Sequence, residues 1–179
     1  MKRTLFAVPL ALAALFVMAW ILLSPAGDPP VAGENAPAFT LLSNEGNEVS
    51  LADYRGDWVV LYFYPKDFTR GCTIEAHNFQ RDLSLYEDKN TVILGVSVDD
   101  ADSHRDFCAK EGLSFKLLAD TEGVVSRAYG SLRDAAGIQL SARNTFIIGP
   151  DGVVGDTFIG VSPKPHSEEV LDALALLQS

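Results

Sequence analysis

The chain has 179 residues, which is enough for one well-packed domain and too few for two of ordinary size. Its 24 acidic and 14 basic residues give a net charge of −10, and no run of basic residues follows Lys2 and Arg3, so the sequence predicts no nucleic-acid partner. A hydrophobic content of 47% excludes general disorder, and two cysteines are too few for a disulfide-stapled small fold or an all-cysteine zinc site.

An uncharged apolar stretch lies near the start of the chain. As a helix rising about 1.5 Å per residue, residues 4–23 span roughly 30 Å, the thickness of the hydrocarbon core of a bilayer. Because Lys2 and Arg3 precede this stretch, the positive-inside rule predicts that the rest of the chain is exported. A cleaved signal peptide is the alternative, since Ser24 and Ala26 are small residues at a potential cleavage site. We therefore expect an extracytoplasmic protein, tethered to the membrane or released from it.

The sequence predicts three segments: a membrane anchor or signal peptide over residues 1–26, a linker over 27–35 and a folded domain over 36–179. The linker concentrates proline, glycine and acidic residues and shows no apolar period, which is typical of a solvated connection.

The first clear elements of the domain are two near-continuous apolar runs, residues 58–64 and 91–98. Such runs are typical of strands that are buried on both faces of a sheet. Apolar residues recur between them at helical spacing, at Ala76, Phe79, Leu83 and Tyr86. Strand, helix and strand together predict a right-handed crossover between parallel strands.

The later elements are predicted in the same way. The pattern predicts a helix from about Ser103 to Glu111 that ends at Gly112, and then a strand within 115–120. A short helix within 124–129 and a hairpin about the turn at 150–152 follow. The final helix presents four apolar residues on one face: Val170, Ala173, Leu174 and Leu177. These elements predict an α/β fold in which helices flank both faces of a mixed central sheet.

Cys72 is the first candidate for chemistry. It follows the buried run 58–64 and stands at the start of the next helix, outside the carboxyl end of a central strand, where α/β proteins bind ligands. The positive end of a helix dipole favours a thiolate there. In the same loop, Pro65 ends the strand, Thr69 supplies a hydroxyl, and Gly71 permits a close backbone approach. By position alone, a small buried side chain without chemistry is an equal alternative.

The surrounding sequence resembles a known family. VVLYFYPKDFTRGCTIEAHNF is similar to the active site of peroxiredoxins of the bacterioferritin-comigratory-protein or peroxiredoxin Q branch, and the resemblance extends over about residues 34–179. It implies a thioredoxin-like fold and reduction of hydrogen peroxide or organic hydroperoxides by a cysteine thiolate. The family motif Pro-x-x-x-Thr-x-x-Cys falls here on Pro65, Thr69 and Cys72. By the same resemblance, Thr69 holds the peroxide, and Arg143 stabilises the thiolate and the transition state.

The resemblance also bears on how the oxidised cysteine is recycled. Many relatives carry a resolving cysteine five residues after the first, where this chain has His77, and a proline where it has Arg70. Cys108 resembles the resolving thiol that a subset of the branch carries in the next helix. Since a disulfide needs Cα atoms within about 7 Å, we expect the start of the first helix to unwind locally. Two alternatives stay open. In the first, Cys108 only packs one face of its helix and a separate thiol resolves Cys72; in the second, Cys72 and Cys108 form a permanent disulfide.

The resemblance implies a thioredoxin or thioredoxin-like electron donor, no cofactor beyond thiols, and a monomer. We expect no metal site, because the histidines show no ligand spacing and are more typical of solvated or capping residues; they are His77, His104 and His166.

Two other functions compete with the peroxidase. A membrane-anchored copper-binding protein of the Sco type needs a second cysteine at the position of Ala76, and a thiol–disulfide oxidoreductase needs one at the position of Glu75. Glu75 is expected either to orient Arg143 or only to favour the helix dipole.

Overall fold

The computed structural model describes residues 27–135 and 137–179. A seven-stranded sheet in the order β2-β1-β5-β4-β3-β8-β9 forms its centre, and a two-stranded sheet pairs β6 with β7. The strands are β1 (Thr40–Ser43), β2 (Glu48–Ser50), β3 (Trp58–Phe63), β4 (Thr91–Ser97), β5 (Lys116–Ala119), β6 (Leu132–Ala135), β7 (Ile138–Ser141), β8 (Asn144–Ile148) and β9 (Val154–Ile159). The helices are η1 (Leu51–Tyr54), α2 (Arg70–Arg81), α3 (Leu83–Glu87), α4 (Ala101–Glu111), α5 (Val124–Ala128) and α6 (His166–Leu177).

The sheet is mixed, as predicted. β4 pairs in parallel with both β3 and β5, whereas β8 pairs antiparallel with β3 and with β9. The predicted parallel crossover from β3 to β4 and the predicted hairpin of β8 and β9 are both confirmed.

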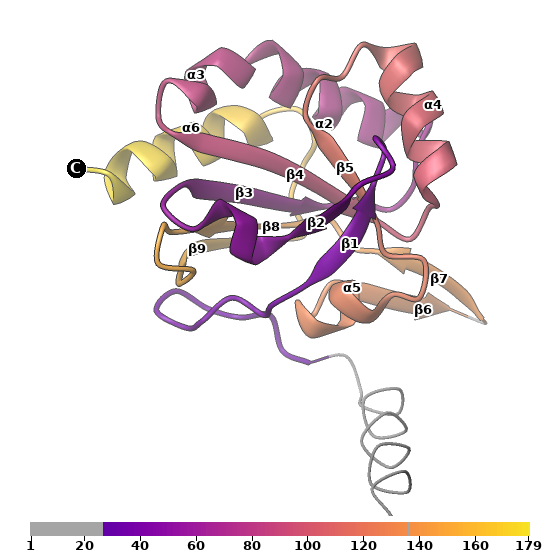
Figure 1. Cartoon of the computed structure of the whole chain (residues 1–179), viewed down its shortest axis with the longest axis horizontal. Coiled ribbons are helices and arrows are strands. Elements are labelled where there is room, and N and C mark those ends of the chain that lie inside the picture. The colour runs from indigo at the N-terminus through magenta and orange to yellow at the C-terminus, as the bar shows by residue number, and fades with distance from the viewer. Residues whose placement is uncertain (1–26, 136) are drawn as a thin grey trace, which may run out of the picture.

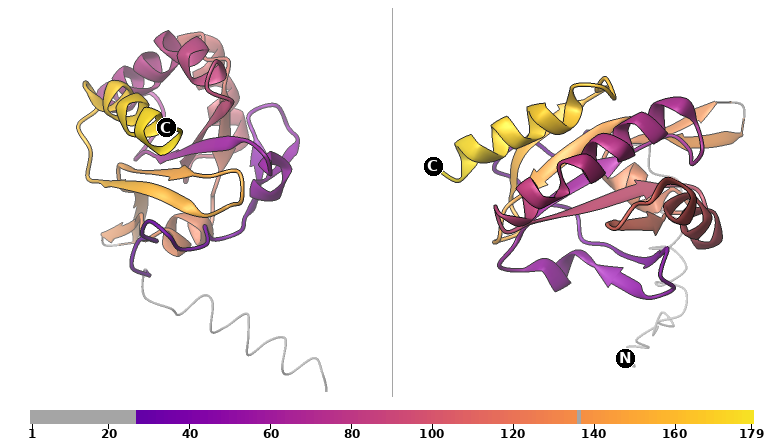
Figure 2. Two further views of the ribbon diagram at one scale, coloured as in Figure 1. Left: turned by 90° about the vertical axis from the view of Figure 1, so that its left-hand side faces the viewer. Right: turned by 90° about the horizontal axis from the view of Figure 1, so that it is seen from above.

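Helices cover both faces of the sheet (Figure 1). α2, α3, α4 and α6 lie over one face, where α6 runs alongside α2 (Figure 2). α5 and η1 lie over the other face. Because the central strands are covered twice, their side chains are buried on both sides, which explains their continuous apolar sequences. The first face packs Val60, Tyr62, Ile93 and Ile147 against Phe79, Phe107, Val170 and Leu174. The second packs Leu61, Phe63, Val96 and Phe146 against Leu51, Val125 and Tyr129.

Several element boundaries differ from the prediction. The expected single helix after β3 divides at Asp82, whose carboxylate accepts hydrogen bonds from Arg81 and Ser167. α4 begins at Ala101 rather than Ser103, because the Asp100 carboxylate caps it by accepting the Ser103 amide at 2.8 Å. The β1–β2 and β6–β7 hairpins are not among the predicted elements.

The segment that precedes the domain also differs from the expected solvated linker. Pro30 is buried, and its carbonyl accepts the Thr157 hydroxyl at 3.0 Å. Gly33 and Glu34 exchange backbone hydrogen bonds of 2.8 Å with Val154. The folded unit therefore extends further toward the N-terminus than Ala36. The predicted anchor or signal peptide over residues 1–26 lies outside the described residues.

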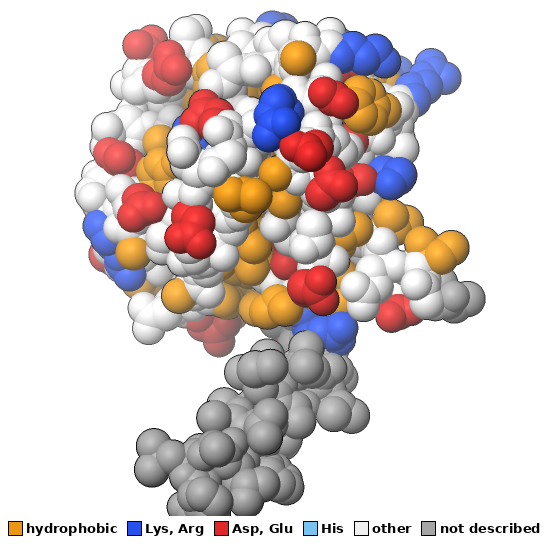
Figure 3. All heavy atoms as spheres, turned by 45° about the vertical axis from the view of Figure 1, so that its right-hand side comes forward, with side chains coloured by type: hydrophobic (Ala, Val, Ile, Leu, Met, Phe, Trp, Pro, Cys, Tyr) orange, Lys and Arg blue, Asp and Glu red, His pale blue; other side chains and the backbone are white. Residues whose placement is uncertain are grey.

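Acidic side chains are spread over the face of the molecule shown in Figure 3, and the whole chain carries a net charge of −10. No helix within residues 27–135 and 137–179 is long and apolar enough to cross a membrane.

Candidate active site

Cys72 lies at the carboxyl end of β3, in the first turn of α2, and is only 1% exposed. Pro65 follows β3 in the loop to α2, and Thr69 is the residue that precedes the helix. The structure therefore places these three motif residues where the sequence predicts them. The loop turns back through Phe68, whose φ of 59° is rare for a bulky residue.

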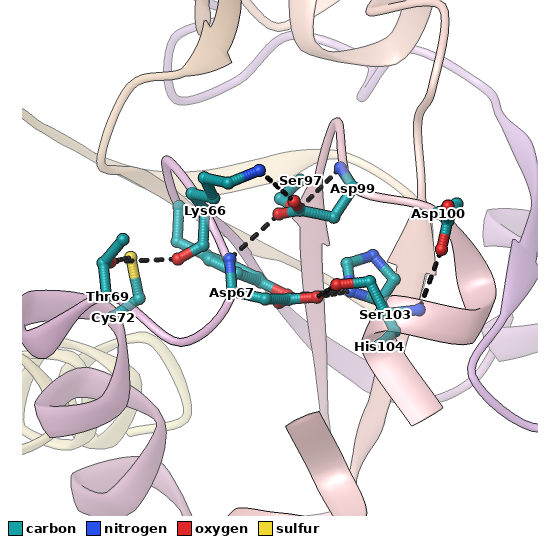
Figure 4. A network of polar contacts seen from close by, with 10 residues as sticks. Lys66, Asp67, Thr69, Cys72, Ser97, Asp99, Asp100, Ser103 and His104 are labelled. Atoms are coloured by element: carbon teal, nitrogen blue, oxygen red, sulfur yellow. Dashed lines mark hydrogen bonds and ion pairs between the residues drawn. The ribbon is translucent and has the colours of Figure 1, made fainter. Parts of the chain in front are cut away.

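Thr69 contacts the sulfur directly (Figure 4). Its Oγ1 lies 2.8 Å from Cys72 Sγ and 3.0 Å from the carbonyl oxygen of Lys66. A hydroxyl has one proton to donate. It donates to the carbonyl when the cysteine is a thiol, and it is free to donate to the sulfur when the cysteine is a thiolate.

Sheet pairing brings Arg143 to the same point. Phe63 at the end of β3 lies opposite Asn144 at the start of antiparallel β8, so the residue before Asn144 reaches the loop that follows β3. Arg143 Nη2 donates to Cys72 Sγ at 3.1 Å. Gly71 makes room for this contact, since a Cβ atom at residue 71 would lie 2.7 Å from Arg143 Nη2. The structure thus joins residues that are 71 positions apart in the chain.

Glu75 binds the second terminal nitrogen of the Arg143 guanidinium, the one that does not contact Cys72. Its Oε2 accepts a short hydrogen bond from Arg143 Nη1, and the carboxyl is 1% exposed. Burial raises the pKa of Glu75 to about 7, although the positive charge of Arg143 acts in the opposite direction. For Arg143, burial opposes the charge, but the neighbouring Glu75 and Cys72 outweigh it and raise the pKa of the guanidinium. Glu75 therefore contacts Arg143, in agreement with one of the two hypotheses from the sequence.

Cys108 lies in α4 and is 7% exposed. It belongs to the same apolar cluster as Cys72 and Tyr62, and both cysteines are free thiols in this structure. Burial, followed by the negative charge of Asp67, raises the pKa of Cys108 to about 12. In this conformation Cys108 is consequently a protonated, shielded thiol.

The predicted character of the histidines needs correction. His104 and His166 are fully buried rather than solvated. His104 Nδ1 lies 2.8 Å from Asp67 Oδ2, and His166 Nε2 lies 2.7 Å from Thr145 Oγ1. The contact between Asp67 in this loop and His104 on α4 is not among the predictions, because a histidine on a largely polar helix carries no sequence signal of burial.

Comparisons with known proteins agree with this geometry. The AhpC/TSA family model matches residues 32–157. Peroxiredoxin Bcp of Bacillus subtilis is 37% identical over 146 residues, which cover 79% of this chain and 93% of that protein. The crystal structure of a Xylella fastidiosa PrxQ variant superposes with a TM-score of 0.80 at 32% identity, over 86% of this chain and all of that one.

Two solved structures of Xanthomonas campestris peroxiredoxin Q extend this agreement. One is 34% identical to this chain, with a TM-score of 0.77, and the match covers 83% of this chain and 99% of that one. The other is 35% identical, with a TM-score of 0.75, and the match covers 81% of this chain and 98% of that one. Both are cysteine-to-serine variants, and their substituted positions are 36 residues apart, the same separation as between Cys72 and Cys108.

The comparisons contradict the expected location outside the cytoplasm. Relatives from Sedum lineare and rice are named as chloroplastic peroxiredoxins Q. No helix in the described part of the chain is long and apolar enough to cross a membrane. The expectation depended on the apolar stretch at residues 4–23 and on the residues that flank it, all of which lie outside the described residues. The extracytoplasmic and membrane-tethered assignments are therefore withdrawn.

The family match covers most of the chain, and the relatives are peroxiredoxins along nearly their whole length. The sheet order and flanking helices are those of a thioredoxin-like fold. The comparisons give no support to a Sco-type copper protein. The chain belongs to the AhpC/TSA family and is a thiol peroxidase of the Bcp/PrxQ type.

Proposed function

We propose that Cys72 is the nucleophile of this peroxidase and that Cys108 is the thiol that resolves it. Thr69 and Arg143 position the peroxide, and Pro65 shapes the loop that carries Thr69 and Cys72. The observation that supports this proposal best is the convergence of Thr69 Oγ1 and Arg143 Nη2 on the Cys72 sulfur, at 2.8 and 3.1 Å.

In the first step, the Cys72 thiolate attacks one oxygen of the hydroperoxide and the O–O bond breaks. A proton goes to the departing oxygen, so that ROOH leaves as ROH and the sulfur becomes a sulfenic acid. Arg143 cannot lose its proton at neutral pH, so its charge stabilises the thiolate and the oxygen on which negative charge develops. Thr69 donates a hydrogen bond at the same place.

In the second step, the Cys108 sulfur attacks the Cys72 sulfenic acid, an S–S bond forms, and the hydroxyl leaves as water with the proton of Cys108. Cys108 is buried and protonated in the present conformation, so it has to become accessible for this step. Local unwinding of α2 supplies that access. The equal cysteine spacing in the Xanthomonas campestris variants supports this pairing.

In the third step, an external dithiol reduces the Cys72–Cys108 disulfide and is itself oxidised to a disulfide. We infer a thioredoxin or thioredoxin-like donor, and a protein that acts as a monomer, from the family resemblance. The substrates are hydrogen peroxide and organic hydroperoxides. An alkyl peroxide reduction activity is described for the bacterioferritin comigratory protein of Xanthomonas campestris, which is 33% identical to this chain.

Two substitutions test the assignment. Cys72→Ser is expected to abolish peroxide consumption, because Thr69 and Arg143 converge on this sulfur. Cys108→Ser is expected to reduce one peroxide per chain and then stop, when thioredoxin is the only donor. Peroxide consumption by each purified full chain, followed against a donor-only control, measures both. Continued multiple turnover by Cys108→Ser would overturn the resolving role, and turnover by Cys72→Ser would overturn the nucleophile.

A further inference from the structure

A buried polar cluster ties the Cys72 loop to the helix that carries Cys108 (Figure 4). At its centre is Asp67, which is 3% exposed and stands two residues before Thr69. Its carboxylate accepts the hydroxyls of Tyr64 and Ser103, each at 2.8 Å, and lies 2.8 Å from His104 Nδ1. Three donors therefore converge on one buried carboxylate, two of them from the first turn of α4.

The backbone of the same loop is also held in place. The Asp67 amide donates to Asp99 Oδ2 at 2.9 Å, and Asp99 also accepts the Ser97 hydroxyl at 2.7 Å and the Lys66 ammonium at 3.0 Å. Ser97 ends β4. The start of the loop, at Lys66 and Asp67, is thus bonded both to the end of β4 and to α4. Separating these residues from their partners would leave a charge and several polar groups buried and unpaired.

The first turn of α2, which contains Cys72, has weaker support. Its N-cap Thr69 makes no side-chain capping bond, and no acidic residue stands in the first turn. Further along α2, Asn78 Nδ2 donates to the carbonyls of Pro163 and Lys164 at 3.1 and 2.9 Å. Glu75, in the second turn, is buried and paired with Arg143. Unwinding is therefore easiest between Asp67 and Glu75, where Cys72 lies.

We propose that Asp67 and His104 are positioning residues for the resolving step. Their contact, which we call the pivot, keeps the start of the Cys72 loop attached to α4 while the first turn of α2 unwinds. This inference rests on the proposed function, because it needs Cys108 to attack Cys72. Each partner of the pivot lies a short way from one cysteine: Cys72 is five residues after Asp67, and Cys108 is one helical turn after His104.

These separations allow the two sulfurs to meet while the pivot stays closed. Five extended residues reach about 17 Å, whereas the four helical residues from His104 to Cys108 rise only about 6 Å. When the first turn of α2 unwinds, the chain between Asp67 and Cys72 is therefore long enough for Cys72 to reach Cys108. Holding both chain segments at one point raises the effective concentration of one sulfur near the other.

Loss of the pivot has a specific chemical consequence. The contacts that activate Cys72 come from Thr69 and Arg143 and do not involve His104. The peroxide step should therefore proceed, while the sulfenic acid waits longer for Cys108. A second hydroperoxide then oxidises Cys72–SOH to the sulfinic acid and leaves as the alcohol, or as water when it is hydrogen peroxide.

The experiment compares three variants of the reduced full chain. His104→Leu removes one of the two α4 donors to Asp67 and leaves Ser103 in place. His104→Asn restores a nitrogen donor near the position of Nδ1. Asp102→Asn is the matched control, because Asp102 lies on the same helix, and its partner is the exposed Arg105 rather than Asp67. Each variant is mixed with hydrogen peroxide, quenched at intervals with a thiol-blocking reagent, and analysed by mass spectrometry for free Cys72, the Cys72–Cys108 disulfide and Cys72 sulfinic acid.

For His104→Leu, we expect loss of free Cys72 within about twofold of the unaltered rate, disulfide formation slower by at least about threefold, and a larger sulfinic fraction. His104→Asn should recover most of the disulfide rate, and Asp102→Asn should match the unaltered chain. Disulfide formation by His104→Leu at the unaltered rate, or an equal fall in both steps, would overturn the pivot. If the unaltered chain itself forms no Cys72–Cys108 disulfide, the proposed function fails first and the pivot with it.

Discussion

The contact between Arg143 and Cys72 depends on the absence of a side chain at residue 71. A Cβ atom there would lie 2.7 Å from Arg143 Nη2, a distance that forces the guanidinium to move. We predict that Gly71→Ala lowers the rate constant for Cys72 oxidation by about tenfold or more, equivalent to roughly 1.4 kcal/mol of lost transition-state stabilisation.

Stopped-flow mixing with hydrogen peroxide measures this rate. Gly149→Ala is the matched control, because the nearest atom to its Cβ would be in the exposed side chain of Asp151, at 3.1 Å. Equal oxidation rates for Gly71→Ala and the control would show that the position of Arg143 is not limiting.

Glu75 makes stability depend on pH. Burial raises its pKa from 4.5 to about 7, so between these values the folded chain binds a proton that the unfolded chain has released. The contribution of Glu75 is therefore fully present below about pH 4.5 and is lost as pH rises toward 7, by about 3 kcal/mol in all. We predict that Glu75→Gln removes this decline. Urea unfolding of the reduced chain at several pH values measures it, and parallel pH profiles for both proteins would contradict the prediction.

Some site residues could be identified from sequence and others could not. Pro65, Thr69 and Cys72 follow one another in a single loop with a recognisable spacing, and Arg143 occurs in a segment that resembles the family. His104 carries no such signal, because its burial results from the contact between α4 and a loop that is distant in sequence.

Among the helices, α4 shields its own cysteine. Cys108 is 7% exposed, and burial raises its pKa to about 12, so very little thiolate is present near pH 8. We predict that iodoacetamide modifies Cys108 in the native reduced chain at least about tenfold more slowly than in the urea-unfolded chain. Peptide mass spectrometry of the alkylated protein follows the reaction. Modification at the same rate in both states would mean that α4 does not shield the thiol.

The elements themselves were predictable in proportion to their burial. β3 and β4 are apolar along their whole length because both faces are covered, and that pattern is visible in the sequence. β1, β2 and β7 are only three or four residues long and expose part of each strand, so their mixed sequences resemble loops. These strands form because they pair with other strands, and the local sequence pattern does not show that pairing.

Across the molecule as a whole, residues 30–36 brace the β8–β9 hairpin. Pro30, Gly33, Glu34 and Ala36 bond to the backbone or side chains of residues 152–157. We predict that a chain starting at residue 37 has a lower melting temperature than one starting at residue 27, because it loses these bonds and the burial of Pro30. Thermal unfolding of the two reduced proteins tests this. Equal melting temperatures would restore the view of this segment as a passive linker.

The proposed catalytic cycle requires that peroxide drives Cys72 and Cys108 into one disulfide. To test this, the reduced full chain is treated with one equivalent of hydrogen peroxide, digested without reductant and analysed by mass spectrometry. We predict a new peptide pair joined through Cys72 and Cys108. Two untouched thiols, or Cys72 oxidised beyond the sulfenic acid beside a free Cys108, would contradict it.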